Sequence, residues 1–173
     1  MATQASPMVS VEEYLRSAYE PDCDYVDGVV EERNLGEYEH GKIQTMLLRM
    51  LGNREVEWGI DVVAECRMQI SSSRFRVPDI LAMRREHKIK RIVQYAPLLC
   101  IEVLSPEDTW KRLKGRLDDY LAFGVKHIWV FDPEDREVYT YDGEGYHKVT
   151  GPELAIESTQ IKVSIAEVFS VLD

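Results

Sequence analysis

One glutamate, Glu102, lies inside the apolar segment LLCIEVL, which is typical of a buried central strand. A carboxylate in such a strand loses favourable hydration unless a cation or good hydrogen bonds replace the water. Glu102 is therefore either a metal ligand, a buried ion-pair partner of an arginine, or a strand-end residue that reaches solvent. The first interpretation makes it the first candidate for chemistry, and the other two give it a structural role only.

Two more carboxylates belong to neighbouring segments of the same kind. Asp79 follows Pro78 and precedes the apolar run ILAM, although Pro-Asp is also a common turn dipeptide. Glu65 lies within VVAECRMQI, where a solvated strand face is the alternative. Carboxylates from adjacent strands form the oxygen-rich site that suits Mg²⁺ or Mn²⁺. The sequence therefore predicts a divalent-cation site, and no Ser-His-Asp order or glycine-rich phosphate loop indicates another chemistry.

Positive charge gathers in two clusters, one after each of the strands predicted to carry Asp79 and Glu102. The first cluster comprises Arg84, Arg85, Lys88, Lys90 and Arg91, and the second comprises Lys111, Arg112, Lys114 and Arg116. If the two strands are neighbours, both clusters could border the same end of the site and contact phosphates. The alternative is a solvated loop and an exposed helix face.

The overall charge limits how nucleic acid could bind. The 173 residues include 21 Lys plus Arg and 31 Asp plus Glu, a formal net charge of −10. This excludes a uniformly basic surface but not a local basic site. The length predicts a single domain over residues 1–173. Three scattered cysteines predict neither a disulfide scaffold nor a zinc site, and the lack of a signal sequence or apolar span predicts a cytoplasmic protein.

Periodicity and turn signals predict the elements that would position these residues. The predicted helices cover residues 10–17, 37–54, 106–123 (with Ser105 as its cap) and 165–172. The predicted strands cover a hairpin at 24–33 and residues 60–70, 76–83, 98–104, 126–131, 136–141 and 145–149. This order predicts an α/β fold: a mixed sheet flanked by helices, with an N-terminal hairpin and C-terminal antiparallel strands.

Several segments occur in a characteristic order and spacing. They are VEEYL, DYVDGVVEE, EHGKIQTML, RVPDILAM, LLCIEVLSPEDTW and RLDDYLAFGVKHIWVFDPEDREVYTY. Together, over about residues 9–169, they resemble the Uma family of putative bacterial restriction endonucleases, within the PD-(D/E)xK nuclease superfamily. The resemblance implies a restriction-endonuclease-like core.

The same resemblance implies roles for individual residues. Asp79 and Glu102 would hold Mg²⁺ or Mn²⁺, with the backbone carbonyl of Val103 as a further ligand. Glu65 matches an acidic position on the preceding strand, and His40 matches a His-Gly pair at a helix start. The ion would lower the pKa of a bound water and offset charge that develops on the scissile phosphate of DNA.

The chain departs from the superfamily pattern at one position. The lysine expected two residues after Glu102 is absent, because Leu104 stands there. The resemblance implies that the positive charge is instead supplied from the following helix, by Arg116, four residues before Tyr120. A residue that must transfer a proton would rather be Lys114, on the other side of the apolar stripe of that helix. Arginine can stabilise a phosphate but cannot act as a general base. Tyr120 is expected to pack in the core with a bonded hydroxyl.

Three functions remain open. The first is a Mg²⁺- or Mn²⁺-dependent DNA endonuclease, with phosphate contacts from Arg84, Arg85, Lys88 and Lys111. The second is a nuclease-like module that binds or assembles but has lost cleavage, as Leu104, Arg116 and the acidic surface suggest. The third is a metal-dependent hydrolase of a small phosphorylated substrate. We expect weak, salt-sensitive binding to DNA and a homodimer.

Overall fold

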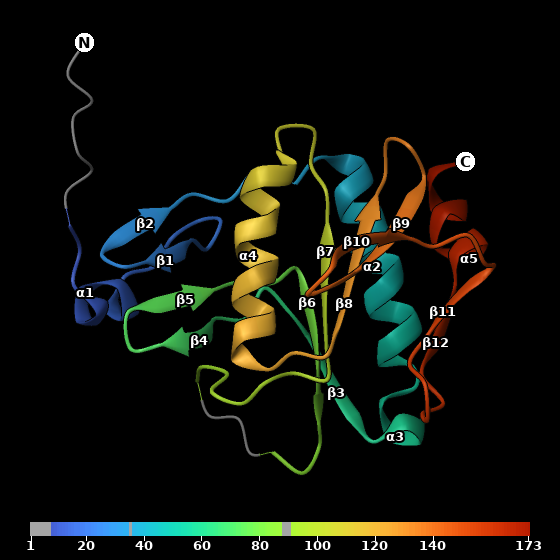
Figure 1. The fold of residues 1–173 in the computed structure, drawn as a ribbon, viewed down its shortest axis with the longest axis horizontal. Coiled ribbons are helices and arrows are strands. Elements are labelled where there is room, and N and C mark those ends of the chain that lie inside the picture. The colour runs from blue at the N-terminus through green and yellow to red at the C-terminus, as the bar shows by residue number, and fades with distance from the viewer. Residues whose placement is uncertain (1–7, 35, 88–90) are drawn as a thin grey trace.

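Three sheets make up the computed structural model, which describes residues 8–34, 36–87 and 91–173 (Figure 1). The central six-stranded sheet has the order β10-β9-β8-β7-β6-β3, a four-stranded sheet has the order β2-β1-β5-β4, and β11 pairs with β12. The strands are β1 Asp24–Val26, β2 Val29–Glu31, β3 Ile60–Ala64, β4 Met68–Ser71, β5 Arg74–Arg76, β6 Ile80–Arg84, β7 Leu99–Val103, β8 His127–Asp132, β9 Glu137–Asp142, β10 Gly145–Lys148, β11 Glu153–Ala155 and β12 Lys162–Ser164. The helices are α1 Val11–Arg16, α2 Tyr38–Gly52, α3 Glu55–Trp58, α4 Trp110–Phe123 and α5 Ile165–Phe169, followed by a 3-10 turn at Ser170–Leu172.

The central sheet is mixed, which confirms the predicted fold class. Strand β6 runs antiparallel to β7, and β7 runs parallel to β8 with α4 as the crossover between them. Ile80 pairs with Ile101. Continued by one residue, this register brings Asp79 opposite Glu102, so the two strands deliver both carboxylates to one end of the sheet.

The two faces of the central sheet bury different helices. Alternate residues of β7 point to opposite faces, as strand geometry requires. Ile101 belongs to the core that contains Leu47 of α2, whereas Cys100 belongs to the core that contains Leu117 of α4. The apolar side chains buried in these two cores make the main stabilising contribution to the fold. No helix within the described ranges has both the length and the apolar character needed to cross a membrane.

The small N-terminal sheet is tied to the central layer by one buried arginine. Arg76, at the end of β5, is 6% exposed. It donates to Asp24 Oδ2 on β1 at 2.9 Å and to Asp119 Oδ2 on α4 at 2.8 Å. An aromatic cluster fills the other side of this sheet: Tyr14, Tyr25 and Phe75.

Four predicted element boundaries are wrong. The predicted strand 76–83 begins at Ile80, because Arg76 ends β5 in the small sheet. The predicted strand 60–70 divides at Glu65, whose φ is 50°, because β3 pairs in the central sheet and β4 in the small sheet. The predicted helix 106–123 begins at Trp110, since the Thr109 side chain accepts from the Arg112 N–H and residues 105–108 form a turn. The predicted helix 165–172 ends at Phe169 and tightens into the 3-10 turn.

Candidate active site at the end of strands β6 and β7

Asp79 is buried at the start of β6 and bonded on both carboxylate oxygens. Its Oδ1 accepts from Arg33 Nη2. Its Oδ2 accepts from the Val103 backbone N–H at 2.8 Å and lies 3.3 Å from His40 Nε2. Three elements therefore converge on this carboxylate: the segment after β2, the first turn of α2, and β7.

Glu102 is 1% exposed and has two partners on α4. The Tyr120 hydroxyl donates to Oε1 at 2.5 Å, and Arg116 Nη2 lies 3.2 Å from Oε2. The spacing of 116 and 120 puts both side chains on one face of the helix. The sequence-based expectation of a packed tyrosine with a bonded hydroxyl matches this contact.

Arg116 also contacts the turn that precedes α4. Its Nη2 lies 3.5 Å from Asp108 Oδ1, which accepts from Asn34 Nδ2 at 3.1 Å. Within the described residues, Arg116 Nε is buried and has no hydrogen-bond partner. A buried unpaired N–H is costly, so this atom is a free donor at the site.

Burial and charge shift the two carboxyls in opposite directions. Burial raises the pKa of Glu102 to about 7, with the charge of Arg116 opposing the rise and that of Asp79 adding to it. Burial would also raise the pKa of Asp79, but the hydrogen bond with His40 and the charge of Arg33 lower it below its usual value. Burial lowers the pKa of His40, yet its contact with Asp79 outweighs this and raises it above its usual value.

Glu65 lies near Asp79 without joining it. Its backbone N–H donates to the Asp79 carbonyl at 3.2 Å. Gln44 Nε2 connects the two residues, 3.1 Å from the Asp79 carbonyl and 3.5 Å from Glu65 Oε1. The Glu65 side chain is exposed, because the turn at this residue directs the chain out of the central sheet.

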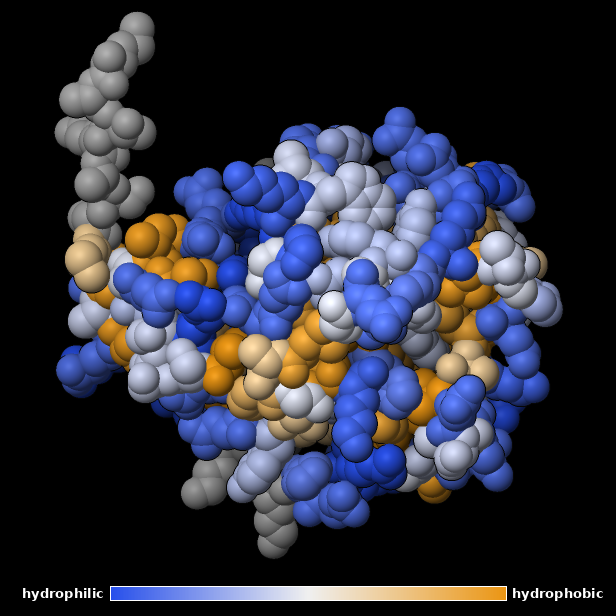
Figure 2. Space-filling view, viewed as in Figure 1, coloured by the Kyte–Doolittle hydropathy of each residue, from blue (hydrophilic) through white to orange (hydrophobic). Residues whose placement is uncertain are grey.

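Arg116 and Lys114 occupy different positions relative to Glu102. Arg116 is buried against Glu102, whereas Lys114 is exposed and pairs with Asp118 at 2.7 Å. Lys111 is exposed in the first turn of α4. Figure 2 shows hydrophilic and hydrophobic side chains together on the face that α4 occupies in this view.

Arg84 and Arg85 of the first basic cluster do not border the carboxylates, contrary to the sequence-based expectation. Because β6 and β7 are antiparallel, Arg84 at the far end of β6 lies beyond the start of β7, at the opposite end of the sheet from Glu102. Arg85 Nε donates to Asp61 Oδ1 at 2.9 Å and to the Ile60 carbonyl. Lys88 lies outside the described residues.

Sequence reasoning missed Arg33. A buried carboxylate requires a cation, but nothing in the pattern shows which of 21 Lys and Arg residues supplies it. Arg33 follows the hairpin strand β2 and precedes α2 in sequence, far from both strands of the site. Only the three-dimensional path of the chain brings it to Asp79.

The carboxylates fit Mg²⁺ or Mn²⁺ in donor type but not in arrangement. Hard oxygen ligands suit both ions. In the described part of the chain, however, no group of three His, Cys, Asp or Glu side chains is placed to hold an ion. The charges of Asp79 and Glu102 are instead opposed by Arg33 and Arg116. Glu65 does not converge with them.

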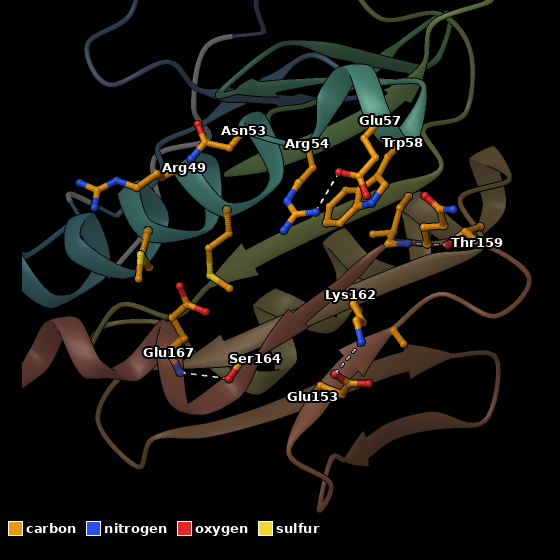
Figure 3. Close-up of a pocket in the computed structure, with 15 residues that line it drawn as sticks. Arg49, Asn53, Arg54, Glu57, Trp58, Glu153, Thr159, Lys162, Ser164 and Glu167 are labelled. Carbon is orange, nitrogen blue, oxygen red and sulfur yellow. Dashed lines mark hydrogen bonds and ion pairs between the residues drawn. The ribbon is translucent and has the colours of Figure 1, made fainter.

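A larger cavity of about 810 Å³ lies elsewhere, between α2, α3 and the β11–β12 hairpin (Figure 3). Its labelled residues include Trp58, and the charged groups of Arg54 and Lys162 pair with Glu57 and Glu153. It shares no lining residue with the two small cavities that contain Asp79. The carboxylate site therefore remains the candidate for chemistry.

Comparisons with known proteins agree with this fold. Residues 11–165 match the Uma2 family, described as "Putative restriction endonuclease". The crystal structure of a putative nuclease of the DUF820 family from Anabaena variabilis superposes with a TM-score of 0.81 at 21% identity, covering 95% of this chain and 99% of that chain. At that identity the likeness concerns the fold. No curated protein matches the chain.

Proposed function

The chain belongs to the Uma2 family of putative restriction endonucleases, and from this membership we propose that it hydrolyses DNA phosphodiester bonds with the help of Mg²⁺ or Mn²⁺. One observation carries the proposal: two buried carboxylates, Asp79 and Glu102, oppose each other at one end of the sheet beside a buried Arg116. Asp79 and Glu102 would hold the ion, with the carbonyl of Val103 as an additional donor, whereas the exposed Glu65 lies outside this group. The ion, when bound, supplies charge neutralisation and a more acidic water.

The remaining residues of the site orient groups and bind phosphate. Tyr120 fixes one oxygen of Glu102, and His40 supports Asp79. Arg116, with its free Nε, binds the phosphate as the charge on it develops, and it transfers no proton. Lys111 is a candidate for the flanking backbone. Affinity for DNA is weak and salt-sensitive, because the chain as a whole is acidic.

Binding of Mn²⁺ and cleavage of plasmid DNA test this proposal together. Wild type should bind Mn²⁺ and nick DNA in its presence, and Asp79→Asn and Glu102→Gln should lose both. Glu86→Gln, which changes a carboxylate that is 70% exposed, is the matched control and should keep both. If Asp79→Asn and Glu102→Gln bind Mn²⁺ as tightly as wild type, the site assignment is wrong.

A specific observation favours a second function, a nuclease-like module that binds DNA without cutting it. Both buried carboxylates already have arginine partners. Retained binding to DNA with no cleavage across Mg²⁺, Mn²⁺ and several substrates would favour this module. Cleavage of small phosphodiesters with inert DNA would instead favour the third function, a hydrolase of small substrates. A single domain and a homodimer remain predictions.

A further inference from the structure

Arg33 brings a buried positive charge to the two carboxylates. It lies in the segment between β2 and α2, and its side chain is 8% exposed. Arginine is protonated throughout the range in which proteins fold, so its guanidinium is charged where it contacts Asp79 Oδ1.

Arg33 and Asp79 border two small cavities. One cavity, about 10 Å³, is lined by Glu102, and the other, about 180 Å³, is lined by Glu65. Arg33 and Asp79 line both. The Arg33 guanidinium thus lines both the cavity with Glu102 and the cavity with Glu65, beside the carboxylates that could attract a divalent ion.

Charge balance opposes an ion while Arg33 stays in place. When both are ionised, Asp79 and Glu102 supply two negative charges, and Arg33 and Arg116 supply two positive charges in direct contact with them. A divalent cation added to this cluster would meet two buried like charges at contact range. Arg33 must leave Asp79 before an ion can bind there.

Asp79 would remain oriented without Arg33. Its other oxygen, Oδ2, keeps the Val103 N–H at 2.8 Å and the His40 contact at 3.3 Å. The released guanidinium has a planar set of donors that matches a phosphate. The cavities it borders are those into which a scissile phosphate would have to come.

We propose that Arg33 is a substrate-binding residue that occupies the cation position at Asp79 in the free protein, yields it to a divalent ion, and then binds a DNA phosphate. This inference rests on the function proposed above. It makes Arg33 a competitor of the metal and a ligand of the substrate. Removal of its charge should therefore strengthen metal binding and weaken DNA binding.

Arg33→Met tests this inference, since methionine removes the charge and keeps much of the length. Titration with Mn²⁺ alone should show about tenfold tighter binding, because an opposing buried charge is gone. Fluorescence anisotropy with a duplex oligonucleotide and saturating Mn²⁺ should show about tenfold weaker DNA binding, because a charged phosphate contact is lost. Arg33→Lys keeps the charge and should stay near wild type in Mn²⁺ affinity, and Arg85→Met, at the other end of the sheet, should change neither affinity.

The outcomes separate this inference from the proposed function. If wild type binds Mn²⁺ through Asp79 but Arg33→Met binds it no more tightly, the inference fails and the proposed function stands. If neither protein binds Mn²⁺, both fail. Should Arg33→Met not fold, Mg²⁺ titration of the wild type by side-chain NMR must shift the Arg33 Nε resonance, assigned with Arg33→Lys. An unmoved resonance at Mg²⁺ saturation overturns the inference.

Discussion

Arg116 Nη2 lies 3.2 Å from Glu102 Oε2, and this pair is enclosed between α4 and β7. Water cannot take the place of either partner, because both side chains are less than a tenth exposed. The pair is therefore a constraint on the fold as well as a part of the site. A substitution of either residue should therefore change the free energy of unfolding, and this change should be measured before any effect on activity is interpreted.

Arg116→Gln should destabilise the protein by about 3–5 kcal/mol, because it leaves Glu102 buried without its cation. The double variant Glu102→Gln/Arg116→Gln should be more stable than Arg116→Gln, since the uncompensated charge is gone. Urea unfolding of wild type, Glu102→Gln, Arg116→Gln and the double variant measures this coupling. Lys114→Gln, which removes an exposed charge on the same helix, is the control and should change little. Strictly additive losses would contradict the coupling.

The stability of the wild type should fall as pH rises relative to Glu102→Gln. The folded pKa of Glu102, about 7, lies above the ordinary 4.5, so the folded state binds the proton more tightly than the unfolded state. The resulting stabilisation is complete below the unfolded pKa and is lost as pH rises through about 7. The loss is on the order of 3 kcal/mol at most. Thermal unfolding between pH 4.5 and 8 checks the sign, and parallel curves for the two proteins would refute it.

Lys111→Glu should weaken DNA binding, whereas Arg84→Glu should not. Lys111 is on the first turn of α4, next to the turn that contacts Arg116, and Arg84 is at the opposite end of the sheet. Removal of one phosphate contact should lower the slope of log affinity against log salt by about one. Anisotropy titrations at several salt concentrations give both slopes. Equal losses for the two variants would point to a net-charge effect instead of a local contact.

Substitution by alanine should change the stability in opposite directions at two glycines, one within α4 and one directly after it. Gly115→Ala should stabilise the protein by about 0.5–1 kcal/mol, because the position is helical and a Cβ there meets no atom within 4 Å. Gly124→Ala should destabilise it by about 1–2 kcal/mol, because the helix ends there with φ of 105°. The added Cβ would lie 3.5 Å from Ala96, an ordinary contact, so strain is the cause. Chemical denaturation compares both with wild type.

The sequence was sufficient for what depends on local pattern. The apolar runs around Asp79 and Glu102 predicted two buried strands with a carboxylate at one end, and the observed sheet has both. Tyr120 was expected to pack in the core with a bonded hydroxyl, and its hydroxyl donates to Glu102. The buried strands and the apolar stripe of the helix need only alternation and helical periodicity.

What the sequence could not supply depends on strand direction and distant contacts. The position of Arg84 relative to Glu102 required knowledge that β6 and β7 are antiparallel, which apolar runs do not encode. The turn at Glu65 arises because consecutive strands enter different sheets. Arg33 reaches Asp79 across 46 positions of sequence, so no spacing rule identifies it.

The hydrogen bond from the Val103 backbone N–H to Asp79 makes the direction of this carboxylate independent of the charged side chains around it. Every amino acid except proline carries this donor, so the direction of the Asp79 carboxylate is encoded by the path of β7 and not by a side chain. Arg33 and His40, which set the local charge, can therefore change by single substitutions while the carboxylate keeps its place. Relatives of this fold can in this way exchange one cation for another without rebuilding the strands.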